Sequence, residues 1–584
     1  MDYDWDLTRI FKNNDELKST INRINDLLKD VIKYKGKIFD NLYEFLELDS
    51  EIDLLCERIY IYSHLKFYED MTNNESKELV NTVLNIYDKA NSERSFVVPE
   101  ILKLDYKSVL DKINNDSRLE KYRFYFEKLF KDKKHILSEK EEKILSDMSS
   151  LYRIPENAFE ELDNTDISFD KLKDEDGNLI TLTNSNYGVL ISSKNRSVRK
   201  SAFNKLYKYY KNHINTFSSL YLGHIKCDKL ISNTRKYSDS LSMYLSSDNI
   251  DKSLYNNLIK CTSDNLSYLY DYYKVKKNVL GLSKYHLYDT YVNISSMPER
   301  KYSYSDSLEI IYKALSILGS EYIKDFKIVI YNRSVSVLPK KGKRSGAFEW
   351  ATYGVLPYVC LNFEGNINSI STVAHEMGHA MHSYYSNLNQ EYVNANYPIF
   401  LAEIASTVNE ILLSEYLFNN TDDKDEKIYY LVEFLNKFKS TIYRQTMFAE
   451  FEKIVHDMED NNENLSRDAL CNIYYDLNKK YFGDAVCIDE DIKYEWSRIP
   501  HFYSSFYVYK YATGFISAII IVDNLKKDKN YKEKYLNFLK SGGSKYPLDI
   551  LKDADIDISD VNVMNRAFEI FNEKLNLLKK YIDE

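Results

Sequence analysis

The stretch ISTVAHEMGHAMHSYY at residues 370–385 decides the fold of the central part of the chain and carries its clearest chemical pattern. Apolar residues recur in it at intervals of three and four, and no proline interrupts them, so we expect an amphipathic helix. His375 and His379 then lie one turn apart on the same face. Two imidazoles at this spacing can share one tetrahedral Zn²⁺, with Glu376 beside the metal-bound water as general base. The pattern is typical of a metal-dependent hydrolase.

Such a site needs a third protein ligand, and two classes of zinc site predict different ones. In one class a third His follows six residues after the second, where this chain has Tyr385. In the other class a Glu comes from a second helix downstream. The segment after Pro398, IFLAEIASTVNEILLSEYLF, has helical spacing, and Glu403 lies in it among apolar residues, where an unpaired carboxylate is costly. We therefore expect Glu403 to be the third ligand, with Glu410 as the alternative.

Three more side chains lie close to these ligands in the sequence. His382 comes too early to be the third His of the first class, and we expect it to be a hydrogen-bonded helix residue. Each metal-binding imidazole also needs an acceptor for its second ring nitrogen. Ser406 and Thr407, about one turn beyond Glu403, are both candidates for that acceptor.

Length and composition predict a large, mainly α-helical globular protein. The chain has 584 residues, 44% of them hydrophobic, which is enough for a sizeable core. It has only 15 Gly and 8 Pro, and helical spacing extends over most of the sequence. A net charge of −10 argues against a nucleic acid as partner.

The start of the chain, MDYDWDLTRIF, has acidic residues where a signal peptide would have basic ones followed by an apolar core. The longest later apolar run, at 515–522, is far shorter than a membrane span. We therefore expect a cytoplasmic protein that does not interact with a membrane. Nothing in the sequence specifies its oligomeric state.

A turn-rich stretch at 162–186 predicts a domain boundary. Before it, helical apolar spacing occurs without any cluster of His, Cys or carboxylate residues, so we expect residues 1–185 to form a helical lid or scaffold domain. Residues 186–584 would then form the catalytic domain with the HEMGH helix.

The pattern changes from helical to strand-like shortly before that helix. FKIVIY at 326–331, VSVLP at 335–339 and LPYVCLNF at 356–363 indicate short strands. We therefore expect a short β-sheet beside the metal-binding helix. An edge strand in this position can hold an extended peptide through main-chain hydrogen bonds.

The second stretch with catalytic potential is RIPHFYSSFYVYKYATGF at 498–515, in which His501 precedes Tyr507, Tyr509 and Tyr511. Peptide hydrolysis develops an oxyanion, which a Tyr hydroxyl or a His N–H can stabilise together with a metal. Because the chain has 53 Tyr, a tyrosine cluster alone would indicate packing. With the added His, the sequence supports a catalytic role and a packing role about equally.

Together these motifs resemble the thimet-oligopeptidase-like zinc metallopeptidases, and specifically their bacterial oligoendopeptidase F branch. The similar segments extend over nearly the whole chain and are WDLTRIF, SFVVPEIL, KKGKRSGAF, LPYVCLNFEG, HEMGH, LAEIAS and HFYSSFYVYKYATGF. The resemblance implies a mainly helical, bowl-shaped endopeptidase with a deep channel. Such an enzyme admits short unstructured peptides and uses one Zn²⁺ per chain.

The resemblance also implies roles for individual residues. The zinc ligands would be His375, His379 and Glu403, and Glu376 would be the general base. His501, Tyr507 and Tyr511 would be the transition-state donors. Relatives space these tyrosines differently after the His, so Tyr509 stays open as an alternative donor.

Three other functions stay open on the sequence. A zinc dipeptidyl carboxypeptidase of the angiotensin-converting-enzyme type also carries HEMGH with a Glu at a similar distance. The segment GAFEW at 346–350 partly matches the Gly-x-Met-Glu-Asn segment with which zinc aminopeptidases hold a free α-amine, but the Met and the Asn are missing. A non-catalytic peptide-binding protein is the third, although it would not need Glu376.

Overall fold

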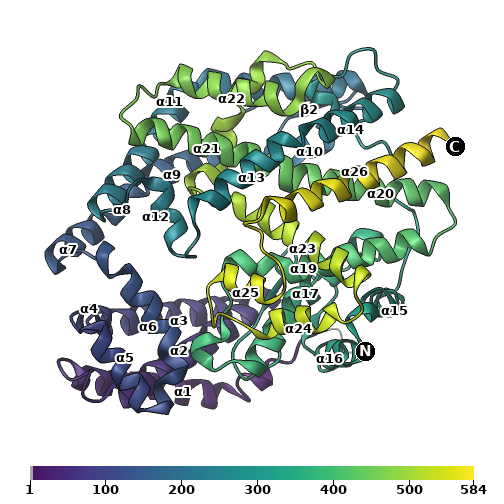
Figure 1. Ribbon diagram of the computed structural model, residues 1–584. Coiled ribbons are helices and arrows are strands. Elements are labelled where there is room, and N and C mark those ends of the chain that lie inside the picture. The colour runs from purple at the N-terminus through teal and green to yellow at the C-terminus, as the bar shows by residue number, and fades with distance from the viewer. Residues whose placement is uncertain (1–3) are drawn as a thin grey trace. The chain divides into compact units, whose positions relative to one another are not determined.

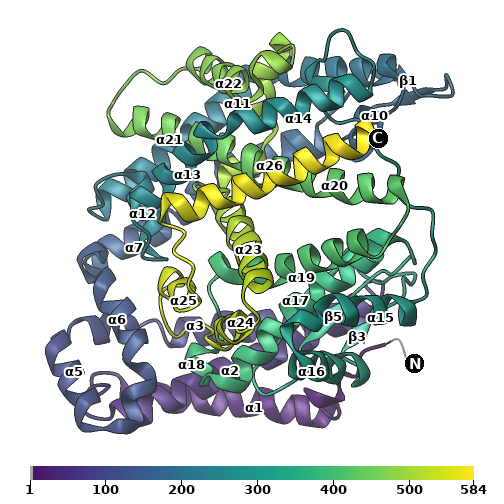
Figure 2. The same ribbon diagram turned by 45° about the vertical axis from the view of Figure 1, so that its right-hand side comes forward.

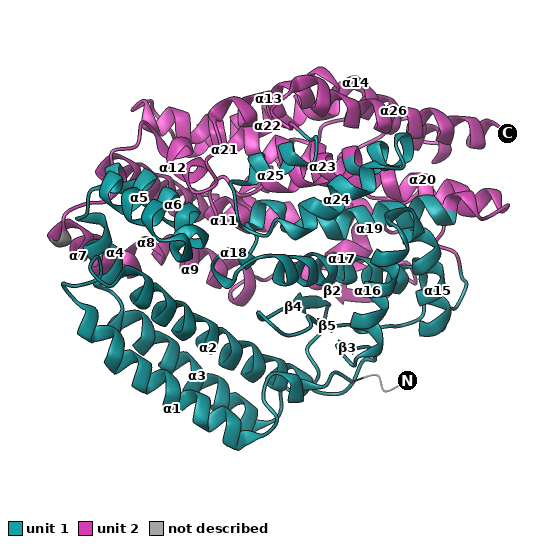
Figure 3. Ribbon diagram, turned by 60° about the horizontal axis from the view of Figure 1, so that its bottom comes forward, with its two compact units in different colours: residues 1–134, 299–417, 521–556 teal, residues 135–298, 418–520, 557–584 magenta. Residues whose placement is uncertain are grey.

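The computed structural model describes residues 4–584, which form helices and two small β-sheets (Figure 1). The chain divides into two compact units, shown in different colours in Figure 3. Unit 1 comprises residues 1–134, 299–417 and 521–556, and unit 2 comprises residues 135–298, 418–520 and 557–584. The predicted boundary between residues 185 and 186 falls inside unit 2. The boundaries of the compact units lie at other positions. The division into a lid or scaffold domain and a catalytic domain at residue 185 stays a prediction.

Unit 1 contains the HEMGH stretch and is built mainly from helices. They are α1 (Asn14–Val31), α2 (Leu42–Glu69), α3 (Asn74–Glu93), α4 (Val97–Leu102), α5 (Tyr106–Asn115), α6 (Arg123–Lys131), α15 (Tyr304–Ala314), α16 (Ser320–Tyr331), α17 (Ile367–Asn389), α18 (Tyr392–Ala395), α19 (Ile399–Asn419), α24 (Tyr531–Lys540) and α25 (Pro547–Asp553). Of these, α2 packs against α1 and α3, and α17 packs against α24.

The sheet of unit 1 has three short strands, β3 (Val335–Ser336), β4 (Phe348–Trp350) and β5 (Tyr358–Cys360). Their order is β3-β5-β4, so β4 lies at an edge, paired antiparallel with β5. Both β4 and β5 pack against α17. The expected sheet beside the metal-binding helix is therefore confirmed.

One expected strand is wrong, because residues 326–331 form the end of helix α16. Phe326, Val329 and Ile330 are buried at helical spacing, so the apolar run covers one helix face. A short apolar run does not by itself distinguish a strand from a buried helix segment.

Unit 2 is also mainly helical. Its helices are α7 (Glu139–Asp147), α8 (Ser149–Tyr152), α9 (Ile154–Glu160), α10 (Asn184–Ile191), α11 (Arg196–Thr234), α12 (Ser240–Ser246), α13 (Lys252–Asp264), α14 (Leu266–Val279), α20 (Lys424–Phe438), α21 (Arg444–Asp460), α22 (Arg467–Phe482), most of α23 (Tyr509–Lys527) and α26 (Val561–Asp583). Within this unit α11 packs against α21 and α22, and α26 packs against α13 and α20 (Figure 2).

The predicted turn-rich region of unit 2 contains a small hairpin of β1 (Lys171–Lys173) and β2 (Leu179–Thr181). Gly177 lies in its turn with φ +84°, a conformation that side chains disfavour and glycine adopts readily.

The predicted fold class, mainly α with small sheets, is confirmed by the elements of both units. Among residues 4–584, no helix is both long enough and apolar enough to cross a bilayer. The expected bowl shape stays a prediction.

Candidate metal centre

Helix α17 presents the two histidines because its opposite face is anchored in the core of unit 1. The helix begins at a capping residue, Asn366, whose side chain accepts from the backbone N–H of Ser369 at 2.9 Å. The apolar residues of α17 are buried at helical spacing; they include Ile370, Val373, Ala374, Met377 and Met381. This burial fixes the rotation of the helix and leaves His375 and His379 on a partly exposed face, with side chains 25% and 15% accessible.

Helix α19 approaches α17 closely at a glycine of the HEMGH motif. A Cβ added to Gly378 would lie 2.5 Å from the Cα of Ser406 and 2.7 Å from the carbonyl oxygen of Ala405. Any side chain at position 378 would therefore push the two helices apart. The close approach brings Glu403, near the start of α19, to the two histidines of α17.

The donor atoms of His375, His379 and Glu403 have the spacing that a tetrahedral metal ion requires. The two Nε2 atoms are 3.3 Å apart, and each lies 3.5 Å from Oε2 of Glu403. Metal–ligand bonds of about 2.0–2.1 Å in tetrahedral geometry separate neighbouring ligands by about 3.3–3.4 Å. Among the described residues, these three form the one cluster of His, Cys or carboxylate side chains with such converging donors. The donor set fits a metal ion.

Electrostatic effects at this site favour an ionised carboxylate at Glu403. A hydrogen bond to His379 lowers the pKa of Glu403 to about 2, against the effect of burial. Burial tends to lower the pKa of His379, but hydrogen bonding and the charge of Glu403 outweigh it and raise that pKa. The same negative charge that attracts a proton to these imidazoles attracts a cation.

The second ring nitrogen of His375 is held by Glu410. His375 Nδ1 lies 2.7 Å from Oε1 of Glu410, which leaves Nε2 directed at the metal position. The expected acceptor, Ser406 or Thr407, is therefore wrong for His375. Ser406 instead donates to Oε2 of Glu403 at 3.1 Å and orients that ligand. Glu410, which the sequence left as an alternative third ligand, fits this supporting position because it lies two turns after Glu403.

Glu376 lies between the two histidines in the sequence and is 7% exposed. Burial raises its pKa, and the positive charge of nearby imidazoles opposes this. A carboxylate with a raised pKa is a better proton acceptor near neutral pH than an exposed one. The structure thus brings together three side chains that could hold a metal ion, with the buried carboxyl group of Glu376 in electrostatic contact with them.

Comparison with known proteins identifies the family. The profile described as "Peptidase family M3" matches residues 189–570, and the profile described as "Oligopeptidase F" matches residues 100–169. The chain belongs to peptidase family M3. It is 38% identical to oligopeptidase PepF of Bacillus subtilis, over 99% of this chain and 87% of the relative. It is 39% identical to an oligoendopeptidase F homolog of Borreliella burgdorferi, over 99% of this chain and 98% of the relative.

A solved structure supports the same assignment. The crystal structure of a protein from Chlamydophila abortus matches with a TM-score of 0.94 and 32% identity, covering 99% of this chain and 98% of that one. The resemblance to the oligoendopeptidase F branch is thereby confirmed. As an M3 peptidase, this protein is a metallopeptidase that hydrolyses peptides and uses a metal ion.

A fourth carboxyl group of this M3 peptidase faces the metal-binding helix. Glu349 lies on β4, between Phe348 and Trp350, and interacts electrostatically with His379 and Glu376. Burial raises the pKa of Glu349 to about 7, although His379 and a hydrogen bond to Ser383 lower it. Residues 346–350, which contain Glu349, partly match an amine-binding segment. In the described part of the chain, Oε1 of Glu349 is buried and has no hydrogen-bond partner, although the carboxyl group also bonds to Ser383.

His382 differs from its prediction as a hydrogen-bonded residue. It is fully buried and stacks on Tyr397, with ring centroids 3.7 Å apart and planes 2° from parallel. Within the part of the chain that the structure describes, neither of its ring nitrogens has a hydrogen-bond partner. Burial lowers the pKa of His382 to about 3, so the ring is a neutral core residue.

The expected oxyanion donors of this M3 peptidase all lie in unit 2, whereas the metal donors lie in unit 1. Nε2 of His501 is 3.3 Å from the hydroxyl of Tyr511, and the rings of Tyr507 and Tyr511 are 5.3 Å apart. The structure thus brings His501, Tyr507 and Tyr511 together. Tyr509 is 1% exposed and its ring contacts Tyr255 in the core, which disfavours it as a donor to substrate.

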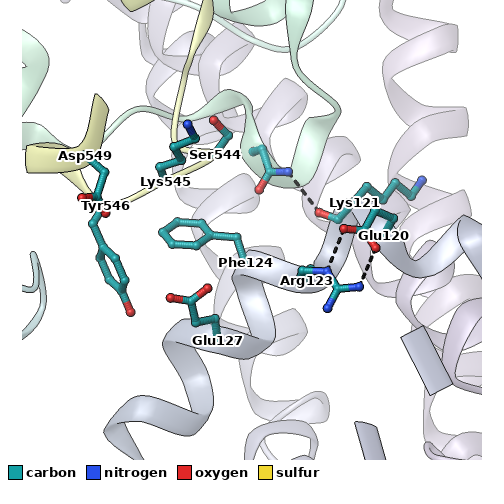
Figure 4. A pocket seen from close by; sticks show the side chains of 10 residues that line it. Glu120, Lys121, Arg123, Phe124, Glu127, Ser544, Lys545, Tyr546 and Asp549 are labelled. Carbon is teal, nitrogen blue, oxygen red and sulfur yellow. Dashed lines mark hydrogen bonds and ion pairs between the residues drawn. The ribbon is translucent and has the colours of Figure 1, made fainter. Parts of the chain in front are cut away.

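A pocket of unit 1 contains none of these residues (Figure 4). Arg123 donates to both carboxylate oxygens of Glu120 at 2.7 Å, and the ring of Phe124 packs against Tyr546 with centroids 5.0 Å apart. Both acidic and basic side chains line this pocket, so its charges favour neither an anionic nor a cationic ligand. We assign it no part in peptide hydrolysis.

Proposed function

We propose that this protein is a zinc-dependent endopeptidase that hydrolyses internal bonds of short, unstructured peptides. The observation that carries the proposal is the triangle of His375, His379 and Glu403 donors with Glu376 beside it, in a chain of the M3 family. Two imidazoles and a carboxylate are a donor set typical of catalytic zinc. We expect one ion per chain and a cytoplasmic enzyme.

The three ligands and Glu376 have separate tasks in this mechanism. A zinc ion held by His375, His379 and Glu403 would lower the pKa of a bound water and polarise the scissile carbonyl. Glu376 accepts the proton of the attacking water and passes it to the leaving amine. The burial of Glu376 supports this role because it raises the pKa of the carboxyl group. A pKa closer to the working pH favours both accepting a proton from the water and donating it to the amine.

We assign the binding of the peptide backbone to strand β4. It is one of the two edge strands of its sheet and packs against helix α17, which carries His375 and His379. An extended peptide can pair with such an edge through main-chain hydrogen bonds, largely independent of its side chains. This mode suits an enzyme that accepts many short peptides.

We assign stabilisation of the oxyanion to His501 with Tyr507 or Tyr511. The support is the hydrogen-bond distance between His501 and Tyr511 and the ring contact of Tyr507 with Tyr511. Burial lowers the pKa of His501, which keeps its ring neutral near pH 7. A neutral imidazole still donates one N–H.

Cleavage of a nine-residue peptide with both termini blocked tests this function. We expect internal cuts that a chelator abolishes and added Zn²⁺ restores, identified by mass spectrometry of the products. Trimming of the free peptide without cleavage of the blocked one would instead support an exopeptidase, including the dipeptidyl carboxypeptidase alternative. Binding without cleavage of either peptide would support a peptide-binding protein.

A further inference from the structure

Four buried ionisable side chains of unit 2 surround the segment that leads into Tyr507, and none of them belongs to the metal-binding set. His224 and Asp228 lie one turn apart on α11. Glu452 and His456 lie one turn apart on α21. None is more than 8% exposed. Burial of so many polar groups is costly unless they are bonded. Oε1 of Glu452 is bonded, whereas its Oε2 has no hydrogen-bond partner in the described part of the chain. Their contacts therefore indicate what the cluster holds in place.

Asp228 is the acceptor at the centre of this cluster. Its Oδ2 accepts from Ser505 Oγ at 2.6 Å and from His456 Nε2 at 3.1 Å, and its Oδ1 accepts from the hydroxyl of Tyr244 at 2.7 Å. The other ring nitrogen of His456 lies 2.8 Å from the carbonyl oxygen of Glu452. Since both nitrogens of His456 meet acceptors, the ring is an imidazolium. Burial tends to lower the pKa of His456, but Asp228 outweighs it and raises that pKa.

Ser505, His224 and Asp228 do not form a nucleophilic triad. The Ser505 hydroxyl has one proton, and its shortest contact directs that proton to Asp228. The 2.9 Å contact with His224 Nε2 is then an N–H donated to the serine oxygen. An activated serine needs the reverse, with its proton directed at an imidazole nitrogen. The three side chains hold the Ser505 segment in place.

Phe506, the next residue, has a strained backbone. Its φ of +56° lies in the left-handed region, which a bulky side chain rarely adopts. Its N–H donates to Oε1 of Glu452 at 2.9 Å. Its ring is 2% exposed and lies against His456, with ring centroids 4.6 Å apart. Such strain persists where the surroundings hold it, and it is found mostly at functional sites.

We propose that Asp228 and Glu452 are positioning residues that hold Ser505 and Phe506 in this strained conformation and thereby orient Tyr507 for the reaction. The inference rests on the proposed role of the tyrosines. The backbone N–H of Tyr507 bonds to the carbonyl of Ser504 at 3.2 Å, so the conformation of residues 504–506 sets the direction in which Tyr507 leaves the turn.

Two substitutions at Glu452 separate its hydrogen bond from its charge. Glu452→Gln keeps an oxygen acceptor for the Phe506 N–H, whereas Glu452→Leu removes the acceptor at similar volume. Burial raises the pKa of Glu452 to about 8, so the wild-type carboxyl is largely protonated at pH 7 and the Gln variant has the same charge. We expect Glu452→Gln to keep kcat within about twofold and Glu452→Leu to lower it about tenfold or more, with a smaller change in KM. A Glu452→Leu enzyme with wild-type kcat would overturn the proposal.

Glu450→Leu is the matched control on the same helix. Glu450 pairs with Lys480 at 2.6 Å and accepts from Tyr481 at 2.9 Å, so its loss also removes a bonded carboxylate from α21. Among the described residues, Glu450 forms hydrogen bonds and an ion pair with Tyr481 and Lys480 and none with residues 504–508. Glu450→Leu should therefore lower thermal stability without lowering kcat. A loss of kcat equal to that of Glu452→Leu would show that general damage to α21 is the cause, and would overturn the proposal.

A double-mutant cycle tests whether Glu452 acts through Tyr507. In a Tyr507→Phe background the hydroxyl that Glu452 helps to place is already missing, so Glu452→Leu should lower kcat by less than about twofold further. Full additivity of the two losses would overturn the positioning role.

Amide exchange at Phe506 tests the contact independently of catalysis. Exchange should be faster in Glu452→Leu than in wild type or Glu452→Gln, and equal exchange in all three would overturn the inference. If Tyr507→Phe kept wild-type kcat, the proposed role of Tyr507 would fail, and the exchange rates alone would decide whether Glu452 holds the segment.

Discussion

Gly378 of α17 lies directly against Ser406 of α19, so closely that a Cβ at position 378 would come within 2.5 Å of the Cα of Ser406. This contact sets the separation of the two helices at the level of the metal donors. His379 follows Gly378 directly, and Glu403 lies one turn before Ser406. The glycine of HEMGH therefore controls the distance between His379 and Glu403, the proposed metal ligands on the two helices.

Gly378→Ala should weaken metal binding. The added methyl group must displace backbone atoms of α19, which moves Glu403 away from the two Nε2 atoms, and overpacking of this kind costs about 1–3 kcal/mol of stability. We expect the dissociation constant for Zn²⁺, measured by competition with a chromophoric chelator, to rise about tenfold or more.

Gly188→Ala is the control for this substitution. Gly188 also lies in a helix, α10, but a Cβ there would meet no atom within 4 Å. Its metal affinity should equal that of wild type. Equal affinity of the Gly378→Ala enzyme would show that the helix separation does not limit metal binding.

Glu410→Ala should also weaken metal binding, through a different cause. Glu410 accepts from His375 Nδ1 at 2.7 Å, and its loss frees the imidazole to rotate and lowers its basicity. We expect Zn²⁺ affinity to fall about 10–100-fold. Glu415→Ala, on the same helix, is the matched control because Glu415 also holds a basic side chain, forming an ion pair with Lys526 at 3.0 Å. If the two variants bound Zn²⁺ with similar affinity, the proposed role of Glu410 in supporting His375 would be wrong.

His382→Phe should make stability less sensitive to acid. The folded pKa of His382 is about 3 and its ordinary value is 6.5, so between these values the unfolded chain binds a proton that the folded chain does not. The contribution of His382 to the free energy of unfolding is therefore fully present above about pH 6.5 and is lost as the pH falls. Between pH 7 and pH 5 we expect a loss of about 2 kcal/mol from this residue. Phe keeps the stacking on Tyr397 but does not titrate.

Urea midpoints of both proteins at pH 7 and pH 5 provide the measurement. The midpoint of wild type should fall further than that of His382→Phe, because all other groups titrate in both. Parallel shifts of the two proteins would mean that His382 is protonated, or solvated, in the folded state.

The local part of the site is predictable from the sequence, because it depends on one helix. The positions of His375, Glu376 and His379 follow from helical periodicity within a single segment. Glu403 is found because a carboxylate stands out in an apolar helix, although its side chain is 51% accessible and not buried as that argument assumed. Both arguments use neighbours in the sequence only.

The parts that were missed depend on contacts between distant segments. Whether Glu410 or Ser406 supports His375 depends on how closely α19 approaches α17, and the stacking of His382 depends on Tyr397, beyond the end of its own helix. The sequence of residues 326–331 predicts a strand although the segment is helical, because a short apolar run fits both a strand and a helix face. The two compact units combine three segments each, which no local pattern encodes.

The most direct test of the account is the Glu376→Gln enzyme, measured for bound zinc and for cleavage of the blocked peptide on the same preparation. Gln fills the place of Glu376 but cannot accept the proton of the attacking water. We predict one zinc per chain, as in wild type, and a kcat lower by about 10²–10⁴-fold. A variant that binds zinc and cleaves at the wild-type rate would contradict the assignment of Glu376 as the base.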